Sequence, residues 1–127
     1  VCIAWSGDVL QLSKDNPKVR FVIPEQGGLR TTDVMAMPKG ARNRDAAAKW
    51  MNFVYDPEQA ARIAAAVQFI SPVKGMRREL EKIDPELAAN PLLFPDDDAN
   101  VRLTTFANFS DEVQQQYDEA FSRIIGA

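Results

Sequence analysis

Short apolar runs dominate the first third of the chain, and their lengths are typical of buried strands. Residues 1–5 (VCIAW) are continuously apolar, and residues 18–24 (KVRFVIP) alternate in part between apolar and polar side chains. Residues 33–38 (DVMAMP) form a further apolar run, which a proline closes. The pattern therefore predicts three strands near the start of the chain.

Helical periodicity begins after these runs. Asn43 is placed to cap a helix over RDAAAKWMNFVY, in which Trp50 lies on the apolar face and is expected in the core. The next segment, DPEQAARIAAAV, begins with Asp56 as a cap and has Pro57 at the first helical position, where its missing N–H costs no hydrogen bond. Two consecutive helices are predicted here.

Shorter segments predict the remaining helices. A short helix fits residues 9–12 and is stopped by KDNP. A charged helix fits MRRELEKI, and a connection with one helical turn fits the proline-rich PELAANPLLFPDDD. Ser110 caps a final amphipathic helix over residues 110–125. Strands and helices in this order indicate an α/β architecture. Three strands are too few for a complete three-layer domain, so the sequence predicts part of a larger fold.

Composition restricts the classes of protein. The chain of 127 residues has the size of one small domain, and its net charge of −3 with scattered Lys and Arg argues against nucleic-acid binding. No apolar run approaches the roughly 20 residues that span a bilayer. The chain has no starting Met and no signal peptide, as expected of a mature chain or a fragment. Cys2, the single cysteine, is expected to be a small buried hydrophobe, with a disulfide to a partner outside the chain as the alternative.

The residue types argue against an enzyme. The sequence contains no histidine, which removes Ser-His-Asp and Cys-His catalysis and the commonest zinc ligand. The stretch EQGGLR has neither the spacing nor the lysine of a phosphate-binding loop. Residues 96–98 (DDD) lack the ligand spacing of a metal loop and are expected in a solvated loop. We therefore expect no catalytic residues, no metal and no cofactor.

The stretch WSGD, residues 5–8, carries the first candidate chemistry. Trp5 and Asp8 follow a predicted strand directly. A packed core accounts for the tryptophan and a helix cap accounts for the aspartate, whereas a ligand cleft accounts for both residues together. The residues alone leave these interpretations open.

Longer stretches resemble a known family. VCIAWSGD, IPEQGGLRTTDVMAMPKGARN and AAAKWMNFVYDPEQAARIA resemble the C-terminal part of the spermidine/putrescine-binding branch of periplasmic solute-binding proteins, which serve ABC importers. The resemblance implies two α/β lobes with a ligand cleft between them. Residues 1–31 would belong to the second lobe and its crossing, residues 32–80 to the first lobe, and residues 81–127 to the second lobe again.

The same resemblance implies the location and the partners. The protein would be periplasmic, bind a small cationic ligand and deliver it to an ABC permease in the inner membrane. The upstream half of the family's length would be needed to complete both lobes. The crossings near Gly27-Gly28 and at residues 80–84 would absorb the closing motion.

The resemblance also implies the ligand-binding residues. Trp5 matches a cleft tryptophan, Asp8 and Asp33 match carboxylates that pair with amines, and Phe69 matches an aromatic of the first lobe, although a core phenylalanine is an equally good interpretation. The sequence departs from the family at Arg30 and Thr31, where the family often has an aromatic. A ligand that carries a carboxylate or hydroxyl as well as an amine then becomes an alternative, with Arg30 as its partner or as a solvated surface residue.

Two further interpretations remain open. Asp8 and Asp33 could form a carboxylate pair for acid/base hydrolysis, which would require one of them to titrate well above its normal range. Alternatively the chain is a ligand-free interaction fragment, whose final helix docks on a partner through Tyr117 and Phe121.

Overall fold

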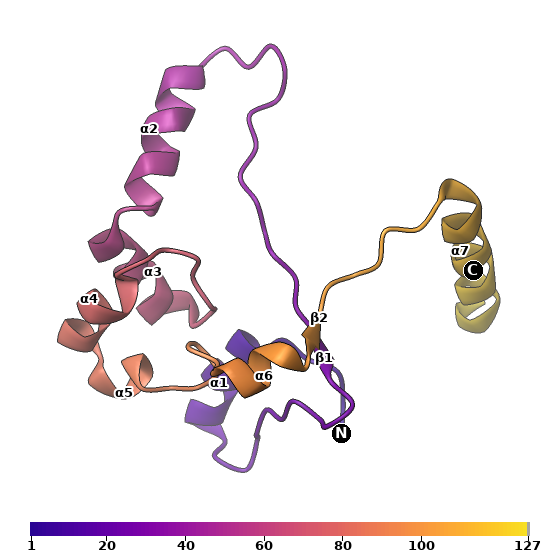
Figure 1. The fold of residues 1–127 in the computed structure, drawn as a ribbon, viewed down its shortest axis with the longest axis horizontal. Coiled ribbons are helices and arrows are strands. Elements are labelled where there is room, and N and C mark those ends of the chain that lie inside the picture. Colours follow the sequence, from indigo (N-terminus) through magenta and orange to yellow (C-terminus); the bar gives the residue numbers. More distant parts are fainter. Residues whose placement is uncertain (127) are drawn as a thin grey trace.

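Helices make up most of the regular structure of this chain. The computed structural model describes residues 1–126 (Figure 1). Seven helices and two short strands lie in this part of the chain. In order they are α1 (Ser6–Asp15), β1 (Gly28–Leu29), α2 (Arg44–Val54), α3 (Pro57–Val67), α4 (Met76–Ile83), α5 (Pro85–Ala88), α6 (Asp97–Val101), β2 (Leu103–Thr104) and α7 (Asp111–Ile125).

The core lies among α3, α4 and α5, which Figure 1 shows side by side. Alanines on one face of α3 let α4 approach closely, so that Met76 and Leu80 are fully buried against them. Leu10 of α1 also packs against this core. The buried members are Ala60, Ala61, Ala64, Met76, Leu80, Leu87, Ala88 and Leu93.

Two of the predicted helix starts are confirmed in detail. The Asp56 carboxylate accepts hydrogen bonds from the backbone N–H groups of Glu58 and Gln59 at 3.0 and 3.2 Å, and Pro57 is the first residue of α3. Ser110 Oγ accepts from the N–H of Val113 at the start of α7. These bonds satisfy donors that have no partner within the helix.

A small parallel sheet joins two distant segments. β1 pairs with β2 so that Gly28 lies opposite Leu103, and the N–H of Gly28 donates to the carbonyl of Arg102 at 3.1 Å. Gly27 precedes this pair with a φ of +99°, and a Cβ added there would lie only 2.5 Å from the Arg102 oxygen. Glycine is therefore required at residue 27 by both backbone angle and space.

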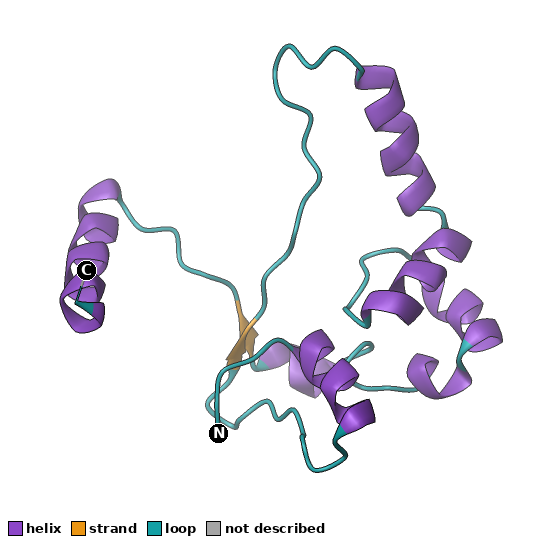
Figure 2. Ribbon diagram, turned by 180° about the vertical axis from the view of Figure 1, so that it is seen from behind, coloured by secondary structure: helices purple, strands orange, loops and turns teal. Residues whose placement is uncertain are grey.

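The three strands predicted from apolar runs are wrong for this structure. Residues 1–5, 18–24 and 33–38 follow extended or looped paths without a paired neighbour, and most of their side chains are exposed. The segment from β1 to α2 runs as one long loop in Figure 2. A strand requires a hydrogen-bonding neighbour, and among residues 1–126 these runs find none. The α/β expectation therefore holds only for the two short strands.

Two expected core residues are also exposed. Cys2 is a free, exposed thiol, and the Trp50 side chain is 60% exposed. Trp50 does lie on the apolar face of α2, where its ring stacks on that of Phe53 with the centroids 5.8 Å apart. The periodicity placed Trp50 on the correct face, but the part of the chain that the structure describes does not cover that face.

The last helix, α7, also has apolar side chains that the described chain leaves exposed. In Figures 1 and 2, α7 lies away from the other helices at the end of an extended segment. Tyr117 stacks on Phe109 with ring centroids 5.0 Å apart, and Phe121 is exposed. Within residues 1–126 no helix has both the length and the apolar character needed to cross a membrane.

Candidate functional site

The first candidate residues lie at the start of α1. Trp5 has an extended backbone and is the N-cap residue of α1, while Asp8 lies in the first turn. No side chain caps this helix, so the interpretation of Asp8 as a capping residue is wrong. Its carboxylate is exposed instead, and a negative charge in the first turn is favoured by the helix dipole.

Phe69 lies directly against this turn. A Cβ added to Gly7 would come within 2.6 Å of a ring carbon of Phe69, so the ring occupies the space that a side chain at residue 7 would need. Nearby, Gln11 Nε2 donates to the carbonyl oxygen of Val67 at 3.0 Å. The structure thus brings the end of α3 onto α1 and places Phe69 beside the turn that carries Asp8.

Arg30, Thr31 and Asp33 form a second group directly after β1. The N–H of Arg30 donates to the carbonyl of Thr104 at 2.7 Å and continues the sheet pairing. Its guanidinium donates to Asn100 Oδ1 at 3.3 Å, so it is held against a neutral amide and carries its charge at the surface. Thr31 and Asp33 are exposed in the loop that follows.

The two groups are not joined to each other by any direct polar contact. No hydrogen bond or ion pair in the described chain links the second group to Trp5, Asp8 or Phe69. The carboxylates of Asp8 and Asp33 are both exposed. Residues 1–126 contain no cluster of three or more His, Cys, Asp or Glu side chains that could hold a metal ion.

Sequence analysis missed three residues at or next to these groups. Gly7 provides the space for Phe69, and Asn100 holds the guanidinium of Arg30. Gln68, at the end of α3, is buried in a left-handed backbone conformation. Gly7 could have been noticed as the glycine of WSGD. Asn100 and Gln68 belong to no local sequence pattern that would indicate a role.

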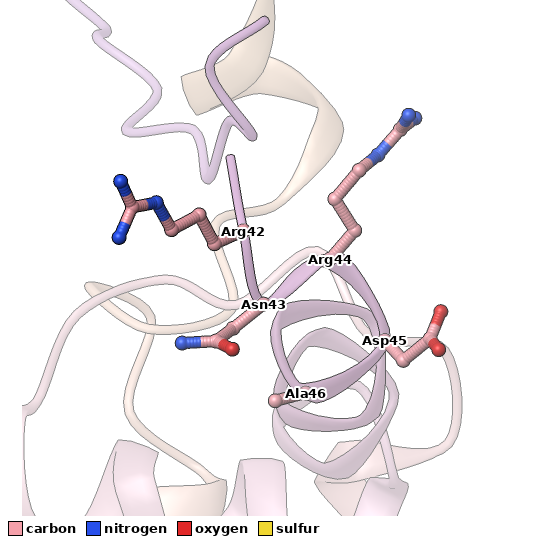
Figure 3. Close-up of a pocket in the computed structure, with 5 residues that line it drawn as sticks. All are labelled: Arg42, Asn43, Arg44, Asp45 and Ala46. Atoms are coloured by element: carbon pink, nitrogen blue, oxygen red, sulfur yellow. The ribbon is translucent and has the colours of Figure 1, made fainter. Parts of the chain in front are cut away.

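Two surface depressions lie away from all these residues. One, of about 350 Å³, surrounds the first turn of α2. Figure 3 shows the Arg42 and Arg44 side chains in this depression pointing away from one another, so their charges do not converge on one point. The other, of about 480 Å³, lies between α3 and α4. Its lining includes the ion pairs Arg62–Glu58 and Lys82–Glu79.

Comparison with known proteins gives a consistent family match. A family model described as bacterial extracellular solute-binding protein matches residues 1–100, which include both groups of candidate residues. No solved structure shows a significant match to the chain.

Several curated proteins are similar over much or all of the chain. The putrescine-binding periplasmic protein PotF of Escherichia coli K12 is 28% identical over 98% of this chain, and the putrescine-binding periplasmic protein SpuD of Pseudomonas aeruginosa UCBPP-PA14 is 27% identical over 98%. The spermidine/putrescine-binding periplasmic protein of E. coli K12 is 29% identical over 72%. The match spans 34%, 35% and 26% of these relatives' lengths, so the chain corresponds to about a third of them or less.

Proposed function

We propose a function on the premise that this chain belongs to the bacterial extracellular solute-binding protein family, a family of binding proteins rather than enzymes. The chain forms part of a periplasmic protein that captures a polyamine of the putrescine or spermidine type for an ABC importer. The observation that carries this proposal is the contact between Phe69 and Gly7, because it assembles an aromatic ring beside Asp8 and Trp5 from separate segments.

The chemistry of a polyamine matches these residue types. An ammonium group removed from water needs an anionic or hydrogen-bonding partner, which the exposed carboxylates of Asp8 and Asp33 supply. The methylene stem packs on flat rings, and an ammonium over a ring face gains about 0.5–2 kcal/mol from cation–π attraction. Trp5, which is half exposed, and Phe69 are the rings available for both contacts.

Two contacts between segments support the proposed lobes, although the core of α3, α4 and α5 continues across the proposed boundary at residue 80. β1 in residues 1–31 pairs with β2 in residues 81–127, as expected if both belong to the second lobe. Phe69 in residues 32–80 touches α1 in residues 1–31, as expected at a boundary between lobes. We propose that ligand binds at this boundary and that its capture brings the lobes together.

Further polypeptide is proposed to complete both lobes. The relatives are about three times as long as the matched region, and the apolar faces of α2 and α7 are uncovered here. The complete protein would present the closed lobes to an inner-membrane permease. The relatives named above are periplasmic by name, which supports the same location for this protein.

An amino acid or another amine with a carboxylate is the alternative ligand. The observation that favours it is Arg30, whose guanidinium contacts only the neutral Asn100 amide among its described hydrogen-bonding partners and so keeps its charge available. The neighbouring Thr31 offers an exposed hydroxyl. A bidentate contact from Arg30 to a carboxylate would then replace the aromatic wall of a simple diamine site.

Tryptophan fluorescence during ligand titration tests the proposal. The complete protein is titrated with putrescine, spermidine and a set of basic and zwitterionic amino acids, with Trp50→Phe to remove the contribution of Trp50. We expect a saturable change with a polyamine that Asp33→Ala abolishes and Asp45→Ala, a carboxylate in α2 outside the site, preserves.

The pattern of response separates the candidates. A response to amino acids alone, lost in an Arg30→Ala variant, would replace the polyamine by the alternative ligand. Silence across the whole panel would refute the ligand-binding function.

A further inference from the structure

Gln68 combines three unfavourable features in one residue. Among residues 1–126 it is the only buried polar residue, with 2% of its surface exposed. Its φ of 57° is left-handed, and no other non-glycine residue among residues 1–126 has a positive φ. Its Oε1 atom is buried and accepts no hydrogen bond. Strain and unsatisfied polar atoms of this kind concentrate at functional sites, since elsewhere they are only a cost.

The location of Gln68 connects it to the proposed site. The carbonyl of the residue before it, Val67, accepts a hydrogen bond from Gln11 of α1. The residue after it, Phe69, packs on Gly7 of α1. Gln68 therefore lies at the junction between α3 and the helix that carries Asp8, held between two contacts to that helix.

The first turn of α1 offers the complementary hydrogen-bond donors. The initial N–H groups of a helix have no acceptor within the helix, and no side chain caps α1 at its N-cap residue, Trp5. The N–H groups of residues 6–8 are therefore available, while the Oε1 of Gln68 lacks a donor. The acceptor belongs to the residue before Phe69, and the donors belong to the turn of α1 that contains Gly7, which Phe69 contacts.

We propose that Gln68 is a positioning residue for ligand capture, an inference that rests on the proposed function. When ligand draws the two lobes together, the Oε1 of Gln68 accepts a hydrogen bond from an N–H in the first turn of α1. This bond fixes Asp8 and Phe69 relative to each other in the ligand-bound state. It is absent in the structure described here, where the acceptor is left unpaired.

The test compares the same substitution at two glutamines in the complete protein. Gln68→Met keeps the length of the side chain and removes the acceptor, whereas Gln114→Met changes an exposed glutamine of α7 in the same way. We expect the Gln68→Met variant to bind putrescine or spermidine about tenfold more weakly, the equivalent of one hydrogen bond, and the Gln114→Met variant to bind like the wild type. Thermal stability without ligand is expected to stay equal or rise in the Gln68→Met variant.

Amide hydrogen exchange gives a second reading that does not depend on affinity. Ligand is expected to slow exchange at an amide of residues 6–8 in the wild-type protein and not in Gln68→Met. Unchanged affinity and unchanged protection in the Gln68→Met variant would overturn the proposal, as would a loss of its stability in parallel with its affinity. A wild-type protein that binds neither polyamine would instead refute the proposed function, and the inference with it.

Discussion

Replacing Gly27 tests the pairing of β1 with β2, which joins two segments far apart in the sequence. In Gly27→Ala the new Cβ would lie 2.5 Å from the carbonyl oxygen of Arg102, and the φ of +99° would have to be held by a residue with a side chain. An ordinary carbon–oxygen contact is about 3.3 Å or longer. The strand β1 must therefore move by about 0.8 Å or change its backbone angles.

The expected cost follows from what this movement breaks. The N–H of Gly28 is 3.1 Å from the same Arg102 oxygen, so an added separation of this size disrupts that hydrogen bond and weakens the next one, from Arg30 to Thr104. Each such bond contributes about 1 kcal/mol, and the left-handed backbone costs an alanine about 1–2 kcal/mol. We expect the free energy of unfolding to fall by about 3 kcal/mol.

Gly40 provides a matched control. Its φ of +84° imposes a similar backbone cost on alanine, but an added Cβ meets nothing within 4 Å. Gly40→Ala should therefore cost only about 1 kcal/mol in urea unfolding of the complete protein, measured at constant m value. Equal unfolding midpoints for the two variants would show that the contact between Gly27 and Arg102 does not constrain the fold, and would refute the reasoning.

Two smaller predictions concern the helical core and its caps. Leu80→Ala removes a fully buried side chain between α3 and α4. It should lower the free energy of unfolding, measured in urea, by about 2–5 kcal/mol, and a loss under about 1 kcal/mol would contradict the assignment of Leu80 to the core. Asp56→Ala removes the acceptor for two N–H groups of α3 and should lower the free energy of unfolding by about 1 kcal/mol. Asn43→Ala should leave the free energy of unfolding almost unchanged, because the Asn43 side chain makes no cap hydrogen bond. Equal losses in the two variants would contradict the assignment of Asp56 as the capping residue.

Most helices were predictable because the signals that form them are local. The exception is α6: residues 96–98, expected in a solvated loop, begin this helix, and the Asp96 carboxylate accepts from the N–H of Ala99 at 2.8 Å. Asp56 and Pro57 define the start of α3 within two residues, and the apolar spacing from Ser110 onward defines α7 in the same way. Such signals act over one or two turns, so they do not depend on what the rest of the protein supplies. The local pattern did not reveal which apolar faces are covered. Trp50 shows this limit, since its face was correct and its burial was not.

The strands were not predictable because pairing is not local. The apolar runs at residues 1–5 and 33–38 have the composition of strands but no neighbour among residues 1–126. The strand that does form, β1, contains only Gly28 and Leu29 and carries no apolar run. Its partner lies more than 70 residues later, and no local sequence pattern indicates this pairing.

The roles of the candidate site residues stay predictions, and only part of their assembly is visible in the structure. The resemblance singled out Trp5, Asp8 and Phe69, and the structure places Phe69 against the turn that carries Asp8. The position of Asp33 relative to them remains a prediction, since it lies in the loop after β1. Gln68 had no recognisable signal, because a left-handed residue at a helix end is usually a glycine.

If the proposed function is correct, the two glycine contacts have a joint consequence for ligand capture. Gly7 ties the end of α3 to the helix of Asp8, and Gly27 ties the segment of Asp33 to β2. If the two aspartates bind the two ends of one polyamine, affinity depends on the distance between them, and that distance is set by both ties. A Gly7→Ala variant would push the Phe69 ring away and should weaken binding without removing any carboxylate. Gly27→Ala acts through the contact with Arg102 instead. Its effect on affinity should add to that of Gly7→Ala if the two segments are positioned independently, and non-additive effects in the double variant would show that their positions are coupled.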